Sequence, residues 1–305
     1  MLNLREQTFG VEIEMTGLTR CEAASVIAKY FGSQTVFVGG GYETYEVKDS
    51  KGRTWKAMRD SSIRPEKKYN GQTINATAHY QTEIVTPILK YDDIDDLQQI
   101  IRNLRKAGAM VNGSCGIHIH VGAEKHTPNT LSNLVKIMAS KEELIYKSLN
   151  VLPARIQSYT KKIEKRFLNA VIQNKPNSMS EFFDEWYENN GGSCNRTFHY
   201  NNSRYHGLNL HATNTKGTVE FRLFNSTLHA GKIKAYVQFC LALNAMAINQ
   251  KAASYRPAAM DNPKYTFRCF LLRLGLIGDE FKTCRLHMLA NLDGNSAWRQ
   301  ADHAA

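Results

Sequence analysis

The 305-residue sequence lacks the features that mark several common classes of protein. It has only six cysteines, none in a Cys-x-x-Cys pair, which excludes a zinc knuckle or a dense disulfide framework and fits a reducing compartment. No run of about 18 apolar residues occurs, so no membrane span is expected. The first fifteen residues carry acids where a signal peptide is apolar. We therefore expect a cytoplasmic protein.

Two common phosphate-binding loops are also absent. No segment fits G-x-x-x-x-G-K-[ST] or G-x-G-x-x-G, although a nucleotide can still be held by metal ions on a sheet. The net charge of +11 suits an anionic partner, whether a nucleotide, a nucleic acid or an acidic metabolite. The densest basic cluster, Lys161, Lys162, Lys165 and Arg166, is typical of a solvated helix face, with a phosphate-binding patch as the alternative.

The spacing of apolar residues predicts an α+β fold. Alternation with period two predicts strands at 8–15, 42–47, 54–58, 78–85, 116–121, 208–212 and 218–224. Helical spacing predicts helices at 21–31, 92–108, 128–149, 153–173 and 231–251, with a short one inside a polar segment, 174–203. Strands that pair through turns, with helices in blocks, favour α+β over a doubly wound sheet. We expect one catalytic domain over 1–250, with 174–203 as a mobile insertion, and a helical extension, 251–305, packed on it.

Three of the predicted strands each carry an i, i+2 pair of chemically active side chains. The pairs are Glu12/Glu14, His118/His120 and Glu220/Arg222. Apolar residues fill the alternate positions, so each strand has an apolar face and a charged face. On one sheet these carboxylates would repel one another unless a cation lay among them. Oxygen ligands with one or two imidazoles favour Mg²⁺ or Mn²⁺ over structural zinc. Glu83, on its own strand, adds a carboxylate.

Each pair alone has a plainer interpretation, as a solvated strand face or a surface ion pair, and only their joint occurrence favours a metal site. Two other functions stay open. One is a cupin-like metal enzyme that uses His118, His120 and Glu124, with His206 or His211 as the later ligand. The other is a non-catalytic, basic protein that binds nucleic acid.

Five segments, in this order, resemble the amidoligase family, a distant relative of glutamine synthetase and of glutamate–cysteine ligase. They are FGVEIE (9–14), TEIVTP (82–87), NGSCGIHIHV (112–121), YHGLNL (205–210) and TVEFRLFNST (218–227). The stretch WKAMRDSSI (55–63) is similar to that family's Trp-x-x-x-x-Asp-x-Ser stretch. The resemblance covers about residues 8–250. It implies a curved, largely antiparallel, glutamine-synthetase-like sheet with helices packed on its convex side.

The resemblance also implies an activity: an ATP- and Mg²⁺-dependent (or Mn²⁺-dependent) carboxylate–amine ligase that forms an amide, peptide or isopeptide, through an acyl phosphate. It implies Glu14 and Glu83 as ligands of one metal ion. It implies Glu12, His118 and Glu220 as ligands of another.

Further residues receive roles from the same resemblance. Arg222 would contact the transferring phosphate, and His120 would face phosphate or substrate. Arg204 is a second candidate for the anion, while Asn209 and Asp60 are candidates for contacts to nucleotide or substrate. Glu12, Glu220 or His120 is the candidate general base. The partners implied are a carboxylate and an amine, as small molecules or peptides, and the oligomeric state stays open.

Overall fold

The computed structural model describes residues 1–193 and 195–298. Among these residues, the strands form one open, antiparallel sheet of eight strands, in the order β2-β3-β4-β7-β1-β8-β10-β9, and a separate hairpin of β5 and β6. The prediction of a mixed fold with a large antiparallel sheet is thus confirmed. The glutamine-synthetase-like detail and the packing of helices on a convex side stay predictions.

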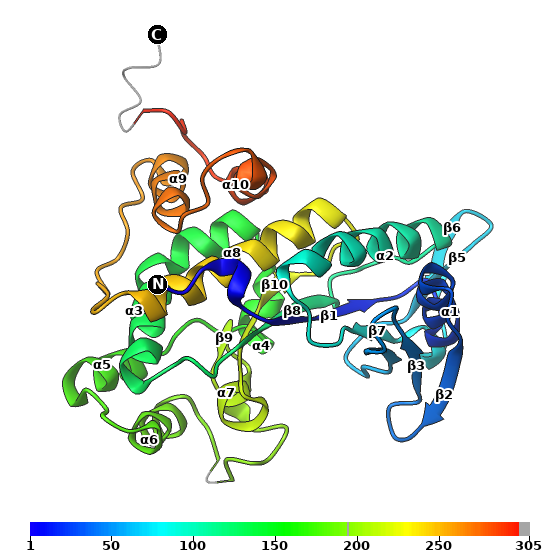
Figure 1. Cartoon of the computed structure of the whole chain (residues 1–305), viewed down its shortest axis with the longest axis horizontal. Coiled ribbons are helices and arrows are strands. Elements are labelled where there is room, and N and C mark those ends of the chain that lie inside the picture. Colours follow the sequence, from blue (N-terminus) through cyan, green and yellow to red (C-terminus); the bar gives the residue numbers. More distant parts are fainter. Residues whose placement is uncertain (194, 299–305) are drawn as a thin grey trace. The chain divides into compact units, whose positions relative to one another are not determined.

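The elements follow the chain as labelled in Figure 1. The strands are β1 (Phe9–Met15), β2 (Thr35–Gly39), β3 (Thr44–Lys48), β4 (Thr54–Met58), β5 (Glu66–Tyr69), β6 (Gln72–Asn75), β7 (Thr82–Val85), β8 (Gly116–Gly122), β9 (Leu208–Asn209) and β10 (Thr218–Asn225). The helices are α1 (Arg20–Phe31), α2 (Ile94–Ala107), α3 (Pro128–Leu149), α4 (Pro153–Ser158), α5 (Lys165–Asn174), α6 (Met179–Asn189), α7 (His211–Lys216), α8 (Ala230–Asn249), α9 (Pro263–Arg273) and α10 (Lys282–Leu289). None of these described helices has the length and apolar character needed to cross a bilayer.

The described chain divides into two compact units. Unit 1 holds residues 1–7, 120–223 and 235–298, and unit 2 holds 8–119 and 224–234. The boundary passes through β8, β10 and α8, each of which gives residues to both units. The predicted division at residue 250 is a different one and stays a prediction.

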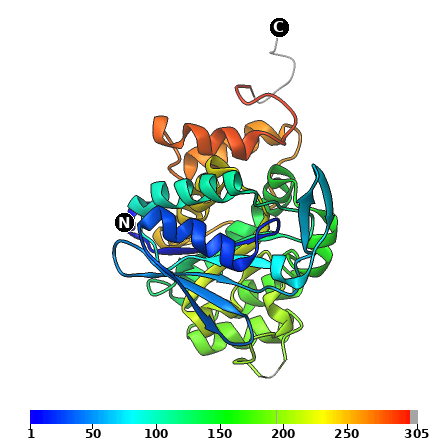
Figure 2. The same ribbon diagram turned by 90° about the vertical axis from the view of Figure 1, so that its right-hand side faces the viewer.

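Alternation along β1 separates the core of unit 2 from its charged face. Val11 and Ile13 are at most 1% exposed and lie in the core, which leaves Glu12 and Glu14 on the opposite face of the strand. Helix α1 begins at a capping box formed by Thr19 and ends at Gly32 in the left-handed region. It packs on β3 and β4 and beside α2 (Figure 2, where α1 is the blue helix).

Unit 1 contains α3 and the C-terminal part of α8. Helix α3 spans the residues predicted for it, because Thr127 caps its start, Pro128 fits its first turn and Asn150 ends it in the left-handed region. Helices α9 and α10 pack against each other, and α10 also packs against α3. The carbonyl of Ser148 accepts a hydrogen bond of 2.8 Å from the Asn291 side chain.

Three predicted elements differ in extent from the structure. The strand predicted at 78–85 begins only at Thr82. Arg20 Nη1 donates to the carbonyls of Ala78 and His79, which form a 3-10 turn instead. The helix predicted at 153–173 is broken into α4 and α5, where Lys161 instead pairs with His206 in a parallel bridge. Such long-range contacts leave no local signal in the sequence.

The strand predicted at 208–212 is also wrong beyond Asn209. The side-chain oxygen of Asn209 accepts a hydrogen bond of 2.9 Å from the backbone N–H of His211, and α7 begins there. The sequence also gave no prediction for β2 or for the β5–β6 hairpin, which are largely exposed.

Asp93 joins the β3–β4 turn of unit 2 to the start of α2. It is 1% exposed and accepts hydrogen bonds from the Arg53 guanidinium (2.7 and 3.1 Å) and from Lys51 Nζ (2.5 Å). Burial alone would raise the pKa of Asp93, but these donors and the Lys90 N–H outweigh it and hold the pKa well below its usual range. The carboxylate therefore stabilises the folded state in its ionised form.

We expect Asp93→Asn to lower the free energy of unfolding by about 2 kcal/mol at pH 7. A depressed folded-state pKa gives stability that is present above the unfolded pKa of about 3.9 and is lost as pH falls through the folded value. The difference between the two proteins should therefore shrink below about pH 4. Urea unfolding at pH 7 and pH 3 measures it, with the exposed Asp92→Asn as the control. An equal loss at both pH values would contradict this electrostatic account.

Candidate functional site

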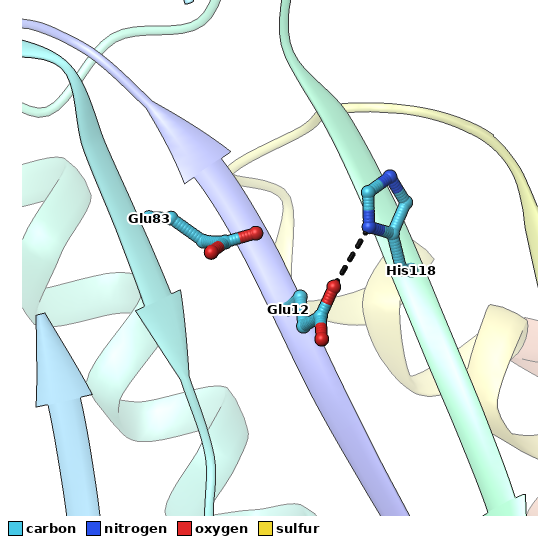
Figure 3. Close-up of side chains that lie close together, drawn as sticks. All are labelled: Glu12, Glu83 and His118. Atoms are coloured by element: carbon cyan, nitrogen blue, oxygen red, sulfur yellow. Dashed lines mark hydrogen bonds and ion pairs between the residues drawn. The ribbon is translucent and has the colours of Figure 1, made fainter. Parts of the chain in front are cut away.

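Three neighbouring strands of unit 2 bring four of the five predicted metal ligands to one face of the sheet. In the antiparallel pairing of β1 with β7, Glu14 lies directly opposite Glu83, and Glu12 lies opposite Val85. Glu12 and Glu14 are two residues apart, so all three carboxylates stand on the same face. His118 comes from β8 and points toward Glu12 (Figure 3).

The side chains of this face contact one another closely. His118 Nδ1 is hydrogen-bonded to Glu12 Oε2 at 2.9 Å, and its Nε2 lies 3.5 Å from Glu14 Oε1. The backbone N–H of Gly116 donates to Glu14 Oε2 at 2.6 Å, which fixes that carboxylate. Figure 3 shows the Glu83 carboxylate reaching across β1 toward Glu12 and His118. His118, Glu14 and Glu83 are at most 8% exposed, so these groups are largely removed from water.

Two overlapping groups in unit 2 can offer ligand atoms to a metal ion. One is Glu12, Glu83 and His118, and the other is Glu14, Asp60 and Glu83, with the ligand atoms of each group within 4.8 Å of one another. Glu83 belongs to both. Asp60, which the resemblance gave a nucleotide or substrate contact, thus lies among acidic ligands. Its place depends on the pairing of Met58 with Glu83, which the sequence alone does not reveal.

The residues present fit a hard divalent cation. Buried carboxylates at such short separations repel one another unless positive charge lies between them. The donors are carboxylate oxygens with one imidazole and no described thiolate, a set that Mg²⁺ and Mn²⁺ accept and that differs from structural zinc sites. Glu14 and Glu83, the predicted ligands of one ion, both belong to one of these groups, and their joint binding of an ion stays a prediction.

In unit 1, Glu220 is held by two predicted site residues. Its Oε2 accepts a hydrogen bond of 2.6 Å from the Asn209 side chain, and its Oε1 accepts one of 2.5 Å from Arg222 Nη1. Glu220 and Asn209 are register partners on β10 and β9. All three residues are at most 6% exposed. The structure therefore brings the predicted acid, amide and guanidinium of unit 1 together.

The other predicted residues of unit 1 have defined contacts as well. His120 Nδ1 is hydrogen-bonded to Thr218 Oγ1 at 2.9 Å, and its Nε2 lies 3.9 Å from Glu220 Oε1. Arg204 donates to the carbonyl of His199 at 3.0 Å and stacks on the rings of Tyr200 and Tyr205. His118 and Glu12 belong to unit 2 and Glu220 to unit 1, so a metal shared by all three stays a prediction.

The later histidines of the cupin-like alternative have structural partners instead. His206 Nδ1 is hydrogen-bonded to the carbonyl of Ser203 at 2.9 Å, and His211 Nδ1 to the hydroxyl of Tyr187 at 2.7 Å. Burial lowers the pKa of both imidazoles, which favours the neutral form. Glu124 is exposed and belongs to none of the candidate metal groups found among the described residues. This geometry disfavours the cupin-like site.

The structure shows contacts for some residues of the basic cluster and of the polar segment 174–203. Lys162 of the basic cluster forms an ion pair with Glu143 and lies over the Tyr146 ring, so one of its four charges is engaged within the chain. In the segment 174–203, Asn201 is 1% exposed and donates to the carbonyl of Asn195 at 3.0 Å. Cys194 of that segment lies outside the described residues.

Comparison with known proteins places the chain in a family. A search of the curated proteins finds no match to it. The family model described as "Putative amidoligase enzyme" matches residues 5–244, a stretch that contains every predicted site residue in both units. This span is well over half of the 305 residues. The family is one of ligases that form amide bonds. The chain belongs to this amidoligase family.

Proposed function

We propose that the protein is an ATP- and Mg²⁺-dependent ligase that joins a carboxylate to an amine through an acyl phosphate. The observation that carries the proposal is the pair of overlapping acidic groups on the sheet of unit 2, which share Glu83. An amide-forming ligase must first turn a carboxylate oxygen into a leaving group, and ATP supplies the phosphate for that step. ATP binds proteins together with divalent cations, and this carboxylate face can hold them.

The proposed reaction has two steps. A carboxylate oxygen of the acid substrate attacks the γ-phosphorus of ATP, and ADP leaves. The amine nitrogen then attacks the acyl carbon, phosphate leaves, and the amine gives up a proton to a base. A bound Mg²⁺ would neutralise charge on the phosphate oxygens during the first step. The products are therefore an amide, ADP and phosphate.

The chain's own residues take the remaining roles. Glu14, Asp60 and Glu83 would hold one cation, and Glu12 with His118 and Glu83 would hold another. Arg222 is the proposed donor to the equatorial oxygens of the transferring phosphoryl group, because a guanidinium offers several N–H donors in one plane.

The amine proton needs an acceptor, and the buried groups of unit 1 are the proposed ones. Glu220 forms the ion pair with Arg222 described above, and His120 has a ring nitrogen 3.9 Å from that carboxylate. Arg204 and Asn209 are proposed to contact the nucleotide or the acid. Glu12 is the other candidate for the base.

ADP formation tests the proposal. The full chain is incubated with ATP, Mg²⁺ and mixtures of amino acids and small peptides as acids and amines. We expect ADP release that requires Mg²⁺, a carboxylate and an amine together, with an amide product of the summed mass less water. ADP release that is unchanged when the acid and the amine are omitted would indicate an ATPase and would contradict a ligase.

A further inference from the structure

Gln81 is a buried glutamine that holds the turn carrying Asp60. Its side-chain N–H groups donate to the carbonyls of Ser61 (3.3 Å) and Ile63 (2.9 Å), and its Oε1 accepts from Arg59 Nε at 2.9 Å. These residues stand at positions −1, +1 and +3 relative to Asp60. One amide group thus contacts the side chain that precedes a proposed metal ligand and two backbone carbonyls that follow it.

Gln81 is itself firmly anchored next to Glu83. It is 8% exposed and directly precedes β7, two residues before Glu83 in the chain. Its carbonyl accepts a hydrogen bond of 3.0 Å from Arg20 Nη1, and Arg20 is 3% exposed and also pairs with Glu43. The Gln81 side chain therefore links the turn that carries Asp60 to the segment that leads into β7, the strand of Glu83.

The Asp60 turn is also attached to β7 through the ladder with β4, which pairs Met58 with Glu83 two residues before Asp60. The Asp60 carboxylate accepts from the backbone N–H of Ser62 at 2.7 Å, which shapes the turn but does not place it. The Ile63 side chain is buried, and the N–H of Arg59 donates to the carbonyl of Tyr42 at 2.8 Å. Among the described contacts, the Gln81 amide gives direct side-chain hydrogen bonds between the turn after β4 and the residue that precedes β7.

We infer that Gln81 is a positioning residue that sets the place of Asp60 beside Glu14 and Glu83, and so sets the affinity of this group for a divalent cation. The inference rests on the proposed function, because it takes these three carboxylates as a cation site. Residues that hold metal ligands through hydrogen bonds typically change metal affinity by about 10- to 100-fold when they are replaced. Gln81 is not itself one of the proposed metal ligands.

The test is Mn²⁺ binding to the full chain without nucleotide, followed through the electron paramagnetic resonance signal of free Mn²⁺. We expect Gln81→Ala to weaken one class of Mn²⁺ site by about 10- to 100-fold and to leave a second class unchanged. Gln81→Glu should weaken the same class, since a carboxylate can accept from Arg59 but cannot donate to the two carbonyls. If Gln81→Ala and Gln81→Glu bound Mn²⁺ as the parent protein does, the inference would be overturned.

Two controls separate positioning from a general loss of structure. Gln98 is also 8% exposed in unit 2 and donates to one carbonyl, that of Ala230, so Gln98→Ala should leave Mn²⁺ affinity unchanged. In an Asp60→Asn background, Gln81→Ala should add little, because its effect passes through Asp60. Equal losses in Gln98→Ala, or full additivity with Asp60→Asn, would refute the role of Gln81. A parent protein that binds no Mn²⁺ would instead count against the proposed cation sites themselves.

Discussion

Glu83→Gln should abolish Mg²⁺-dependent turnover of ATP, with a loss of at least about 10³-fold. Glu83 belongs to both acidic groups of unit 2, so one substitution removes a ligand from each. Glutamine has almost the same shape as glutamate, so the packing of β7 is kept. Removing a negative charge from a crowded carboxylate face should also relieve repulsion in the absence of metal. We therefore expect the free energy of unfolding, measured without metal, to stay equal or to rise.

Glu46→Gln is the matched control for this experiment. Glu46 lies on β3 of the same unit, and its register partner Lys56 lies 3.4 Å away in an ion pair. It belongs to none of the candidate metal groups among the described residues. Its variant should keep the turnover of the parent protein. A Glu83→Gln protein that turned over ATP normally would show that the shared carboxylate is structural and would remove the basis of the proposed metal sites.

Arg222→Lys should lower turnover at saturating ATP by about 10²- to 10³-fold while changing ATP affinity much less. Lysine keeps the positive charge but loses the planar set of N–H donors. Arg222 is 6% exposed, and its Nη1 donates to Glu220 Oε1 at 2.5 Å. The shorter lysine side chain would therefore disturb both the proposed phosphate contact and the hydrogen bond to Glu220. A transition-state role predicts a fall in the maximal rate, whereas a ground-state role predicts weaker ATP binding.

Steady-state rates over a range of ATP concentrations separate these outcomes, and they become measurable once an acid–amine pair is found. Arg166→Lys, an exposed arginine on α5, is the charge-preserving control and should behave as the parent protein does. Urea unfolding shows whether Arg222→Lys is folded. A folded Arg222→Lys protein with an unchanged maximal rate would rule out the phosphate contact that we propose.

Much of the charged face could be predicted from local sequence alone. The alternation of apolar and polar residues in β1 and β8 predicted which side chains share a face. Residues two apart in a strand point to the same side, as Glu12 and Glu14 do. The capped helix α3 was likewise predicted to its ends, because Thr127, Pro128 and Asn150 are local signals. Residues whose conformation depends on their own neighbours are those that the sequence predicts well.

The parts that failed depend on partners far along the chain. Asp60 could not be assigned to the acidic group, because β4 and β7 must first pair Met58 with Glu83. Gln81 gave no signal at all, since its three hydrogen bonds reach residues about twenty positions away. The Arg20 side chain broke the predicted strand near Ala78 for the same reason. Polar contacts of this kind carry no period, so hydrophobic patterning does not detect them.

Calorimetric titration of the full chain with ATP, with and without Mg²⁺, tests the central claim most directly. The account predicts ATP binding that requires Mg²⁺ and is lost in Glu12→Ala. This variant lacks the Glu12 carboxylate, which contacts His118 on the charged face of unit 2. No ATP binding in either condition, or binding that is equally tight in Glu12→Ala and without Mg²⁺, would contradict the account of a metal- and ATP-dependent ligase.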